Sequence, residues 1–114
     1  MNIQDNLKRG TIEMVLLTLL SQADKYGYQL AQDLEQQSCG KYQLSEATMY
    51  PTLYRLKKNG YLEDYKVVVV GKRSRVYYHI TDTGKQYLHN IRTEYKRITN
   101  AIDLILDRYP EEIK

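Results

Sequence analysis

The feature that most constrains this chain is a long apolar repeat near its C-terminal end. Large apolar residues recur there at alternating spacings of three and four: Leu88, Ile91, Tyr95, Ile98, Ile102, Ile105 and Tyr109. A seven-residue repeat held over this length is typical of a coiled-coil helix. We predict one helix from Thr81 or Asp82 to about Tyr109, where Pro110 follows. At 1.5 Å per residue, a helix of about 27 residues is about 40 Å long.

The rest of the chain is too small to cover this seam. The sequence has 114 residues, which suits one domain with one added element. Burying each large apolar side chain is worth roughly 1.5–3 kcal/mol, so such a seam is not expected to stay in water. We predict that two copies pair along it, since twofold pairing is the commonest self-association. The alternative is a helix that folds back onto its own domain.

Two shorter helices are predicted in the first 40 residues. The first has apolar residues at helical spacing, namely Ile12, Val15, Leu16, Leu19 and Leu20, while Met14 and Leu17 lie off that face. This helix should therefore meet more than one neighbour. The second runs from about Gly27 to Gln37, and Gly40 suits a left-handed cap after it. Its predicted inward residues are Tyr28, Leu30, Ala31 and Leu34.

A third helix and two strands are predicted next. The helix should begin near Ser45, whose hydroxyl can accept a hydrogen bond from a first-turn N–H. Pro51 disturbs it, because an internal proline removes one hydrogen bond, and the alternative is a helix that begins at Pro51. Leu62–Val70 and Ser74–Ile80 are rich in Val and Tyr and predict strands. The run Val67–Val70 is expected to pack on the body or on a partner.

Positive charge is concentrated in the same region. From Lys41 to Arg75 there are eight lysines and arginines and three acidic residues, a local net charge of +5 within a total of +3. Such a cluster suits a polyanionic partner. The predicted fold class is mainly α with a small β hairpin (α+β). It consists of a winged helix-turn-helix over residues 1–81, then a dimerisation helix and tail over residues 82–114.

That layout places one helix in the major groove of double-stranded DNA and the hairpin on the phosphates. With Met49, Leu53 and Leu56 buried, the opposite side of the third helix faces outward at 100° per residue. Arg55 can pair with guanine or hold a phosphate. The predicted DNA contacts are Lys41, Ala47, Thr48, Tyr50, Pro51, Tyr54, Arg55 and Lys58, with Lys72, Arg73 and Arg75 on the wing.

Other functions find little support in the sequence. Cys39 is the only cysteine, which excludes an intrachain disulfide and fits a reduced compartment. No apolar run approaches the roughly 20 residues of a membrane span, and we expect a cytoplasmic protein. His79 and His89 are isolated, so no metal, cofactor or catalytic constellation is predicted, and the chain is not expected to be an enzyme. Glu13, Asp33 and Glu35 are interpreted as solvated charges on helix surfaces.

A small aromatic effector is a further possible partner. Tyrosine provides all the aromatic side chains, because the chain has twelve Tyr, no Trp and no Phe. Tyr95 lies at the centre of the seam, where a pocket can form between subunits. The predicted effector pocket consists of Ile12, Leu16 and Tyr95.

Several short motifs resemble one known family. They are Leu7-Lys8-Arg9-Gly10-Thr11, Tyr26-Gly27-Tyr28, Glu46-Ala47-Thr48-Met49-Tyr50-Pro51-Thr52-Leu53, Arg55-Leu56, Gly60-Tyr61-Leu62, Tyr77-Tyr78 and Ile80-Thr81-Asp82-Thr83-Gly84. In this order they resemble PadR-family transcriptional regulators of the short class with a single C-terminal helix, over Leu7 to about Tyr109. The resemblance implies a homodimeric winged-helix repressor, an operator with twofold symmetry, and release by a ligand or stress signal.

The resemblance also has limits. Some family members hold flat aromatic drugs between facing tryptophans, whereas this chain has no Trp and Tyr95 takes what looks like that position. Ser74 and Val76 stand in the wing where proline and a basic residue are more usual. The alternative function is a protein-interaction module that uses the coiled coil without binding DNA. The cations at Arg55, Lys58, Lys72 and Arg73 argue against it.

Overall fold

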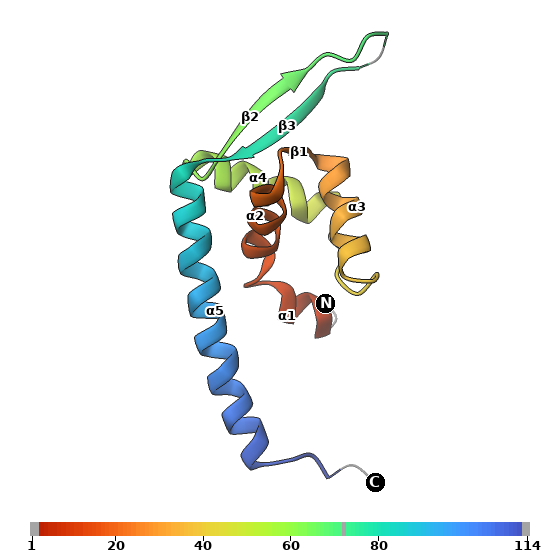
Figure 1. Cartoon of the computed structure of the whole chain (residues 1–114). Helices are drawn as coiled ribbons and strands as arrows, with labels where there is room; N and C mark the ends of the chain where they lie inside the picture. The colour runs from red at the N-terminus through yellow and green to blue at the C-terminus, as the bar shows by residue number, and fades with distance from the viewer. Residues whose placement is uncertain (1–2, 72, 113–114) are drawn as a thin grey trace.

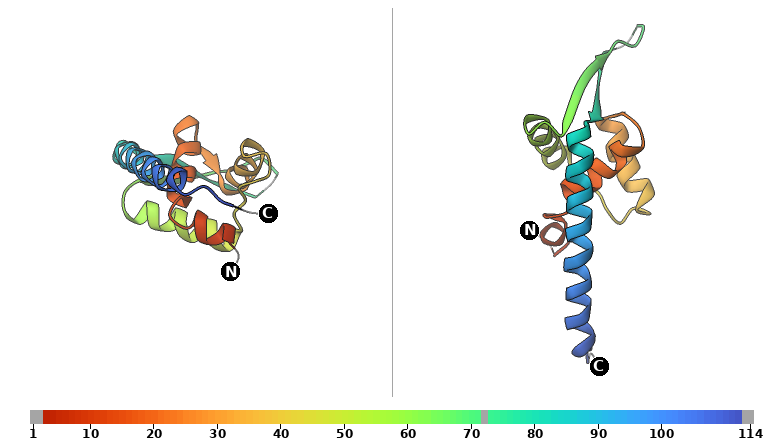
Figure 2. Two further views of the ribbon diagram at one scale, coloured as in Figure 1. Left: turned by 90° about the horizontal axis from the view of Figure 1, so that it is seen from below. Right: turned by 60° about the vertical axis from the view of Figure 1, so that its left-hand side comes forward.

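The computed structural model describes residues 3–71 and 73–112. Its elements are α1 (Ile3–Lys8), α2 (Ile12–Gln22), β1 (Lys25–Tyr26), α3 (Gly27–Gln37), α4 (Glu46–Lys58), β2 (Leu62–Val67), β3 (Arg75–Ile80) and α5 (Asp82–Arg108). The hairpin of β2 and β3 projects from one end of the helical body, and α5 runs down its side and past it (Figures 1 and 2). This confirms the predicted mainly α fold with a small sheet and a long C-terminal helix.

Helix α2 is the centre of the core. Four of its leucines are buried, which are Leu16, Leu17, Leu19 and Leu20, and the helix contacts α3, α4, α5 and β3. The expected helix with more than one neighbour is thus confirmed. The other buried apolar residues are Leu30, Leu34, Met49, Leu53, Leu56, Leu62, Ile80 and Leu88. The burial of these apolar side chains from α2, α3, α4, α5, β2 and β3 is the dominant stabilising contribution to the body.

Helix α3 has the predicted bounds, but one of its four predicted inward residues is wrong. Leu30 and Leu34 are buried and Ala31 packs against the core, whereas Tyr28 is 61% exposed. Residues two apart on a helix point to nearly opposite sides, so Tyr28 cannot share the face of Leu30. The Tyr28 hydroxyl instead accepts a hydrogen bond from Gln32 at the surface. Gly40 has the expected positive φ of 78°.

Helix α4 begins where the Ser45 cap predicts. The Ser45 Oγ accepts a hydrogen bond from the Thr48 N–H at 3.3 Å, and Pro51 lies inside the helix. The alternative start at Pro51 is therefore wrong. Thr52 is buried, and its hydroxyl donates to the Thr48 carbonyl at 2.9 Å, which satisfies the polar atom inside the core. Gly60, with φ at 81°, ends the turn after the helix.

The sheet has the order β1-β3-β2, with antiparallel pairing throughout. The strands of the hairpin are shorter than predicted, because the ladder ends at the pair of Val67 and Arg75. Gly71 has a positive φ of 71° in the connection that follows. Val68 and Val70 are 78% and 96% exposed, so the body does not cover the valine run. Elements α1 and β1 were not predicted, since six and two residues are too short to show a period.

The junction between the hairpin and α5 is tight. The Thr81 Oγ1 caps α5 by accepting from the Gly84 N–H at 3.0 Å, and it donates to the Gly60 carbonyl at 2.7 Å. Gly84 is buried, and a Cβ at this position would collide with the Tyr61 carbonyl oxygen. The absence of a side chain at Gly84 thus lets α5 start directly against the turn before β2.

We predict that Gly84→Ala destabilises the protein by about 1–3 kcal/mol, because the added methyl group overpacks a site closed by backbone. The measurement is the free energy of unfolding in urea. Gly10→Ala is the matched control, since nothing lies within 4 Å of a Cβ there. Equal stability of the two variants would contradict the close packing at Gly84.

The apolar seam of α5 divides into two parts. Leu88 is buried in the chain's own core and Ile91 packs against that core. Leu88 is therefore a core residue, and its assignment to a dimer seam is wrong, because α2 packs against α5 and Leu88 belongs to the buried core. The remaining seam residues are exposed: Tyr95 43%, Ile98 58%, Ile102 46%, Ile105 60% and Tyr109 75%. No helix within the described residues is long and apolar enough to span a membrane.

Candidate nucleic-acid interface

The outer face of α4 carries most of the predicted DNA contacts. Met49, Leu53 and Leu56 are buried as expected, and Thr52 joins them on the inner side. Every predicted contact on α4 and in the loop before it is exposed: Lys41, Ala47, Thr48, Tyr50, Pro51, Tyr54, Arg55 and Lys58. One helix thus presents small residues near its start and cations near its end, as a major-groove reader needs.

Tyr50 has a structural contact as well as an exposed edge. It is 40% exposed, and its hydroxyl end lies against the buried Gly27 at the start of α3. A Cβ at Gly27 would collide with that hydroxyl. Gly27 therefore lets α4 approach the first turn of α3, and this contact fixes the angle between the two helices of the helix-turn-helix.

The cations of α4 differ in their partners. Lys57 forms an ion pair with Asp64 of β2 at 3.0 Å, and Arg55 forms one with Glu13 of α2, with 3.4 Å between Nε and Oε2. The Lys58 side chain has no ion pair or hydrogen bond within residues 3–71 and 73–112. Lys58 is therefore available to a phosphate, whereas Arg55 and Lys57 must share or break an existing contact.

Glu13 is a site residue that the sequence did not predict, since it was interpreted as a solvated charge. Its Oε1 accepts a hydrogen bond from the Tyr87 hydroxyl at 2.5 Å, while its Oε2 faces Arg55. The hydrogen bond to the carboxylate, reinforced by burial, raises the pKa of Tyr87 to about 12. The Tyr87 ring in turn stacks on Tyr61, with centroids 4.1 Å apart. Glu13 is thus a fixed carboxylate at the edge of the α4 face.

The wing carries the second group of cations. Arg73 and Arg75 are exposed, and the Arg75 guanidinium lies over the Tyr26 ring at 4.5 Å from its centroid. Tyr26 also contacts Tyr77, with 5.4 Å between the ring centroids. A guanidinium on an aromatic ring is held in place yet keeps its N–H donors. Lys72 lies outside the described residues.

A carboxylate anchors the base of the wing to the body. Asp24, between α2 and β1, accepts a hydrogen bond from the Tyr65 hydroxyl at 2.7 Å, and its other oxygen lies 2.8 Å from His79 Nδ1. The hydrogen bonds from Tyr65 and His79 lower the pKa of Asp24. Since Tyr65 and His79 lie on β2 and β3, this cluster joins both strands of the hairpin to the segment that follows α2.

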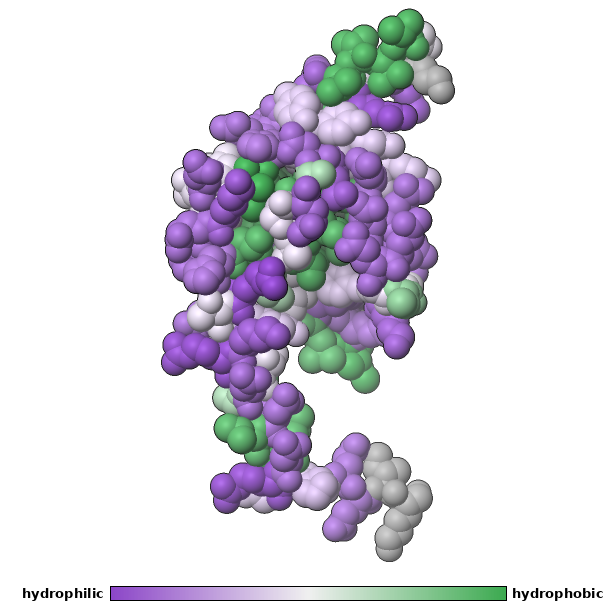
Figure 3. All heavy atoms as spheres, viewed as in Figure 1, coloured by the Kyte–Doolittle hydropathy of each residue, from purple (hydrophilic) through white to green (hydrophobic). Residues whose placement is uncertain are grey.

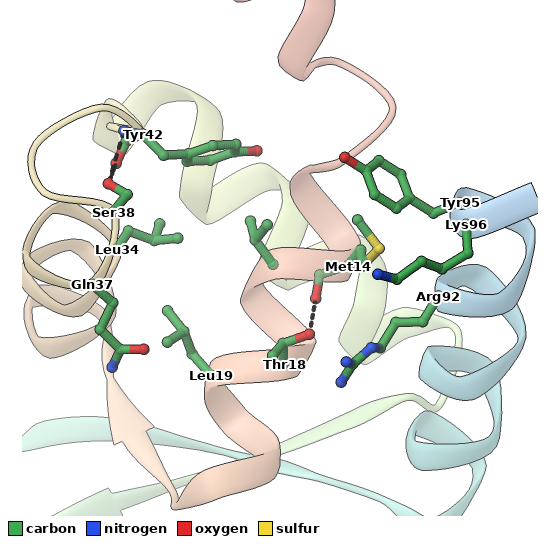
Figure 4. Close-up of a pocket in the computed structure, with 11 residues that line it drawn as sticks. Met14, Thr18, Leu19, Leu34, Gln37, Ser38, Tyr42, Arg92, Tyr95 and Lys96 are labelled. Carbon is green, nitrogen blue, oxygen red and sulfur yellow. Dashed lines mark hydrogen bonds between the residues drawn. The ribbon is translucent and has the colours of Figure 1, made fainter. Parts of the chain in front are cut away.

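Tyr95 lines a pocket of about 370 Å³ between α2, α3 and α5 (Figure 4). Met14, Leu19 and Leu34 contribute apolar walls, and Arg92 and Lys96 stand on the α5 side. The other two residues of the predicted effector pocket do not line it. Leu16 is buried in the core, and Ile12 lines a separate hollow beside α1. The pocket is therefore displaced toward α3 from the site that the sequence indicated.

Among residues 3–71 and 73–112, no three His, Cys, Asp or Glu side chains gather where they could hold a metal ion. Of the acids interpreted as solvated charges, Asp33 forms an ion pair with Lys25 at 2.7 Å and Glu35 accepts from Gln43 at 3.2 Å. These contacts tie the surface of α3 to its neighbours. They are structural contacts at the edges of the helix-turn-helix.

Two successive helices, α3 and α4, followed by a two-stranded wing define a winged helix-turn-helix protein, and the open face of its second helix is cationic. The chain belongs to the PadR-like family of transcriptional regulators, whose profile matches residues 16–90. This confirms the resemblance noted in the sequence. The family is one of DNA-binding regulators of transcription and not of enzymes.

Two solved structures of transcriptional regulators agree with this assignment, and one further relative is similar in sequence. A transcriptional regulator from Clostridium thermocellum superposes with a TM-score of 0.81 at 30% identity, over 86% of this chain and 95% of that one. A PadR family transcriptional regulator from Eggerthella lenta gives a TM-score of 0.80 at 28% identity, over 89% and 86%. A protein of Lysinibacillus sphaericus is 31% identical over 92% of this chain and 96% of its own length.

Proposed function

We propose that this protein is a homodimeric transcriptional repressor that binds an operator with twofold symmetry. The main support for the proposal is that one face of α4 is buried in the core while the opposite face is exposed. Its apolar side is locked into the core, and its other side presents exposed tyrosines, Arg55 and Lys58 next to a cationic wing. This arrangement suits base edges on the helix and phosphates on the wing.

The lower half of α5 supports the dimer. Ile98, Ile102 and Ile105 are each at least 46% exposed on one helix face, and the helix extends beyond the body (Figure 2). Apolar side chains gather there on the surface (Figure 3). A second copy of the same helix covers such a face with matching side chains. In this proposal two copies of α4 enter successive major grooves about 34 Å apart.

Release of the repressor is proposed to depend on the pocket at Tyr95. The pocket lies between α5 and the helices α2 and α3. A small aromatic effector in it would therefore contact the proposed dimerisation helix and the DNA-binding domain together. Effector binding shifts the population of dimer conformations only if the effector prefers one spacing of the two DNA-binding domains. Arg92 and Lys96 at its edge favour an effector that carries negative charge.

The salt dependence of binding tests the DNA proposal. We expect Lys58→Gln to lower the slope of log affinity against log salt by about 1.8, because each dimer loses two phosphate contacts of about 0.9 each. The probe is a duplex from the region upstream of the protein's own gene, titrated by fluorescence anisotropy at several salt concentrations.

Lys57→Gln is the matched control, because Lys57 directly precedes Lys58 but forms an ion pair with Asp64. It should leave the slope nearly unchanged. A wild-type protein that dimerises but binds no duplex would favour the interaction-module alternative. Equal slopes for the wild type and Lys58→Gln would show that Lys58 does not contact a phosphate.

A further inference from the structure

Arg55 is held from one side before any DNA is present. Its Nε lies 3.4 Å from Glu13 Oε2, and the two side chains are 56% and 25% exposed. A guanidinium has five N–H donors, and this contact engages only the Nε–H. Within residues 3–71 and 73–112, no other ion pair or hydrogen bond involves the Arg55 side chain. The two terminal amino groups of Arg55 are therefore available to bind DNA, while the inner nitrogen, Nε, is held by Glu13.

Holding the inner nitrogen has two physical effects. It limits rotation of the guanidinium, so less freedom is lost when its terminal N–H groups pair with a guanine. It also places a negative charge beside the cation, which weakens attraction to any phosphate nearby. The first effect favours a defined base contact, and the second disfavours binding to DNA of arbitrary sequence.

The carboxylate itself is anchored rather than free. Tyr87 of α5 donates to Glu13 Oε1 at 2.5 Å, and the Tyr87 ring is stacked on Tyr61 with an interplanar angle of 3°. A glutamate on a helix surface normally samples several rotamers. Here α5 fixes one oxygen, so the other oxygen stays in the position that meets Arg55.

We infer that Glu13 is a positioning residue that raises sequence specificity by orienting Arg55 and opposing its use as a general phosphate contact. The inference rests on the proposed function, because it requires that α4 bind DNA. Helix α2 would then contribute indirectly to base recognition, because Glu13 orients Arg55 without contacting a base itself.

The test is Glu13→Gln, which keeps the shape and an oxygen acceptor for Tyr87 but removes the charge. Two affinities are measured, for the duplex upstream of the protein's own gene and for a scrambled duplex of equal composition. We expect the ratio of the two to fall by about 3- to 10-fold, as for the loss of one partly exposed ion pair in each subunit. The salt slope for the scrambled duplex should rise by up to about 1.8.

Three further variants separate this role from a structural one. Glu111→Gln makes the same charge change at an exposed residue after α5, and it should leave the ratio unchanged. Tyr87→Phe keeps the carboxylate and removes its anchor, so the ratio should fall by a smaller factor. In an Arg55→Ala background, Glu13→Gln should have no effect on the ratio, because the residue that it orients is missing.

An unchanged ratio in Glu13→Gln, or an equal fall in the Arg55→Ala background, would overturn the inference. These results differ from a failure of the proposed function. If the wild type does not bind the upstream duplex at all, the proposed function fails. If the wild type discriminates between the two duplexes and Glu13→Gln discriminates equally well, only the role of Glu13 is lost. Thermal unfolding of each variant checks that the fold is retained.

Discussion

Replacing Ile98 and Ile102 with glutamate should convert the protein into a monomer and lower operator affinity by at least about 100-fold. Both side chains are exposed in the single chain, at 58% and 46%, so the body should keep its fold. Each isoleucine is about half exposed in the single chain, so covering four of them per dimer recovers roughly half of the 1.5–3 kcal/mol for full burial, about 3–6 kcal/mol in total, and four buried glutamates add a desolvation cost. A micromolar dimer is held by about 8 kcal/mol, so this loss is enough to separate it.

The measurement is the molar mass in solution by light scattering, followed by titration of the upstream duplex. A monomer has only one DNA-binding domain, and its dissociation constant for the duplex should approach the roughly 10⁻⁴–10⁻⁶ M typical of non-specific binding. Thr93→Glu with Asn100→Glu is the matched control, because these residues lie two positions from Tyr95 and Ile98, on the opposite side of α5. A glutamate pair at Ile98 and Ile102 that still sediments as a dimer would show that another surface joins the copies.

The elements with strong local signals were predicted from the sequence. Helix α3 has the predicted ends, because Gly27 and the turn at Gly40 delimit one clear apolar stripe. Helix α4 begins at its Ser45 cap, since the cap and the stripe agree on one start. The spacing of the seam predicted the length of α5. These features depend on neighbours within a few residues, which is the range over which sequence periodicity carries information.

The contacts that shape the site were not predictable in the same way. Glu13 meets Arg55 and Tyr87, which are 42 and 74 positions away in the chain. Nothing local distinguishes Glu13 from the other helix-surface acids, because the partner is chosen by how α2, α4 and α5 pack. Leu88 illustrates the same limit, since its spacing fits the seam while its position in space belongs to the core.

Arg55→Ala should weaken binding to the upstream duplex by about 30- to 10⁴-fold. A bidentate contact between arginine and a base is worth about 1–3 kcal/mol, and a dimer loses two of them, about 2–6 kcal/mol. The Arg55 side chain is 56% exposed and outside the core, so the loss should appear in DNA affinity rather than in stability. Arg97→Ala is the control, because Arg97 also pairs with a glutamate, Glu94, but lies on α5.

Arg55→Lys then separates the two roles that a cation can play at this position. Lysine keeps the positive charge but not the planar fork, so it can replace arginine at a phosphate and not at a guanine edge. We expect Arg55→Lys to retain the salt slope of the wild type while losing most of the preference for the upstream duplex over a scrambled one. A lysine variant with full affinity and full preference would place Arg55 on the DNA backbone, and the base contact would then have to come from the start of α4, at Thr48 or Tyr50.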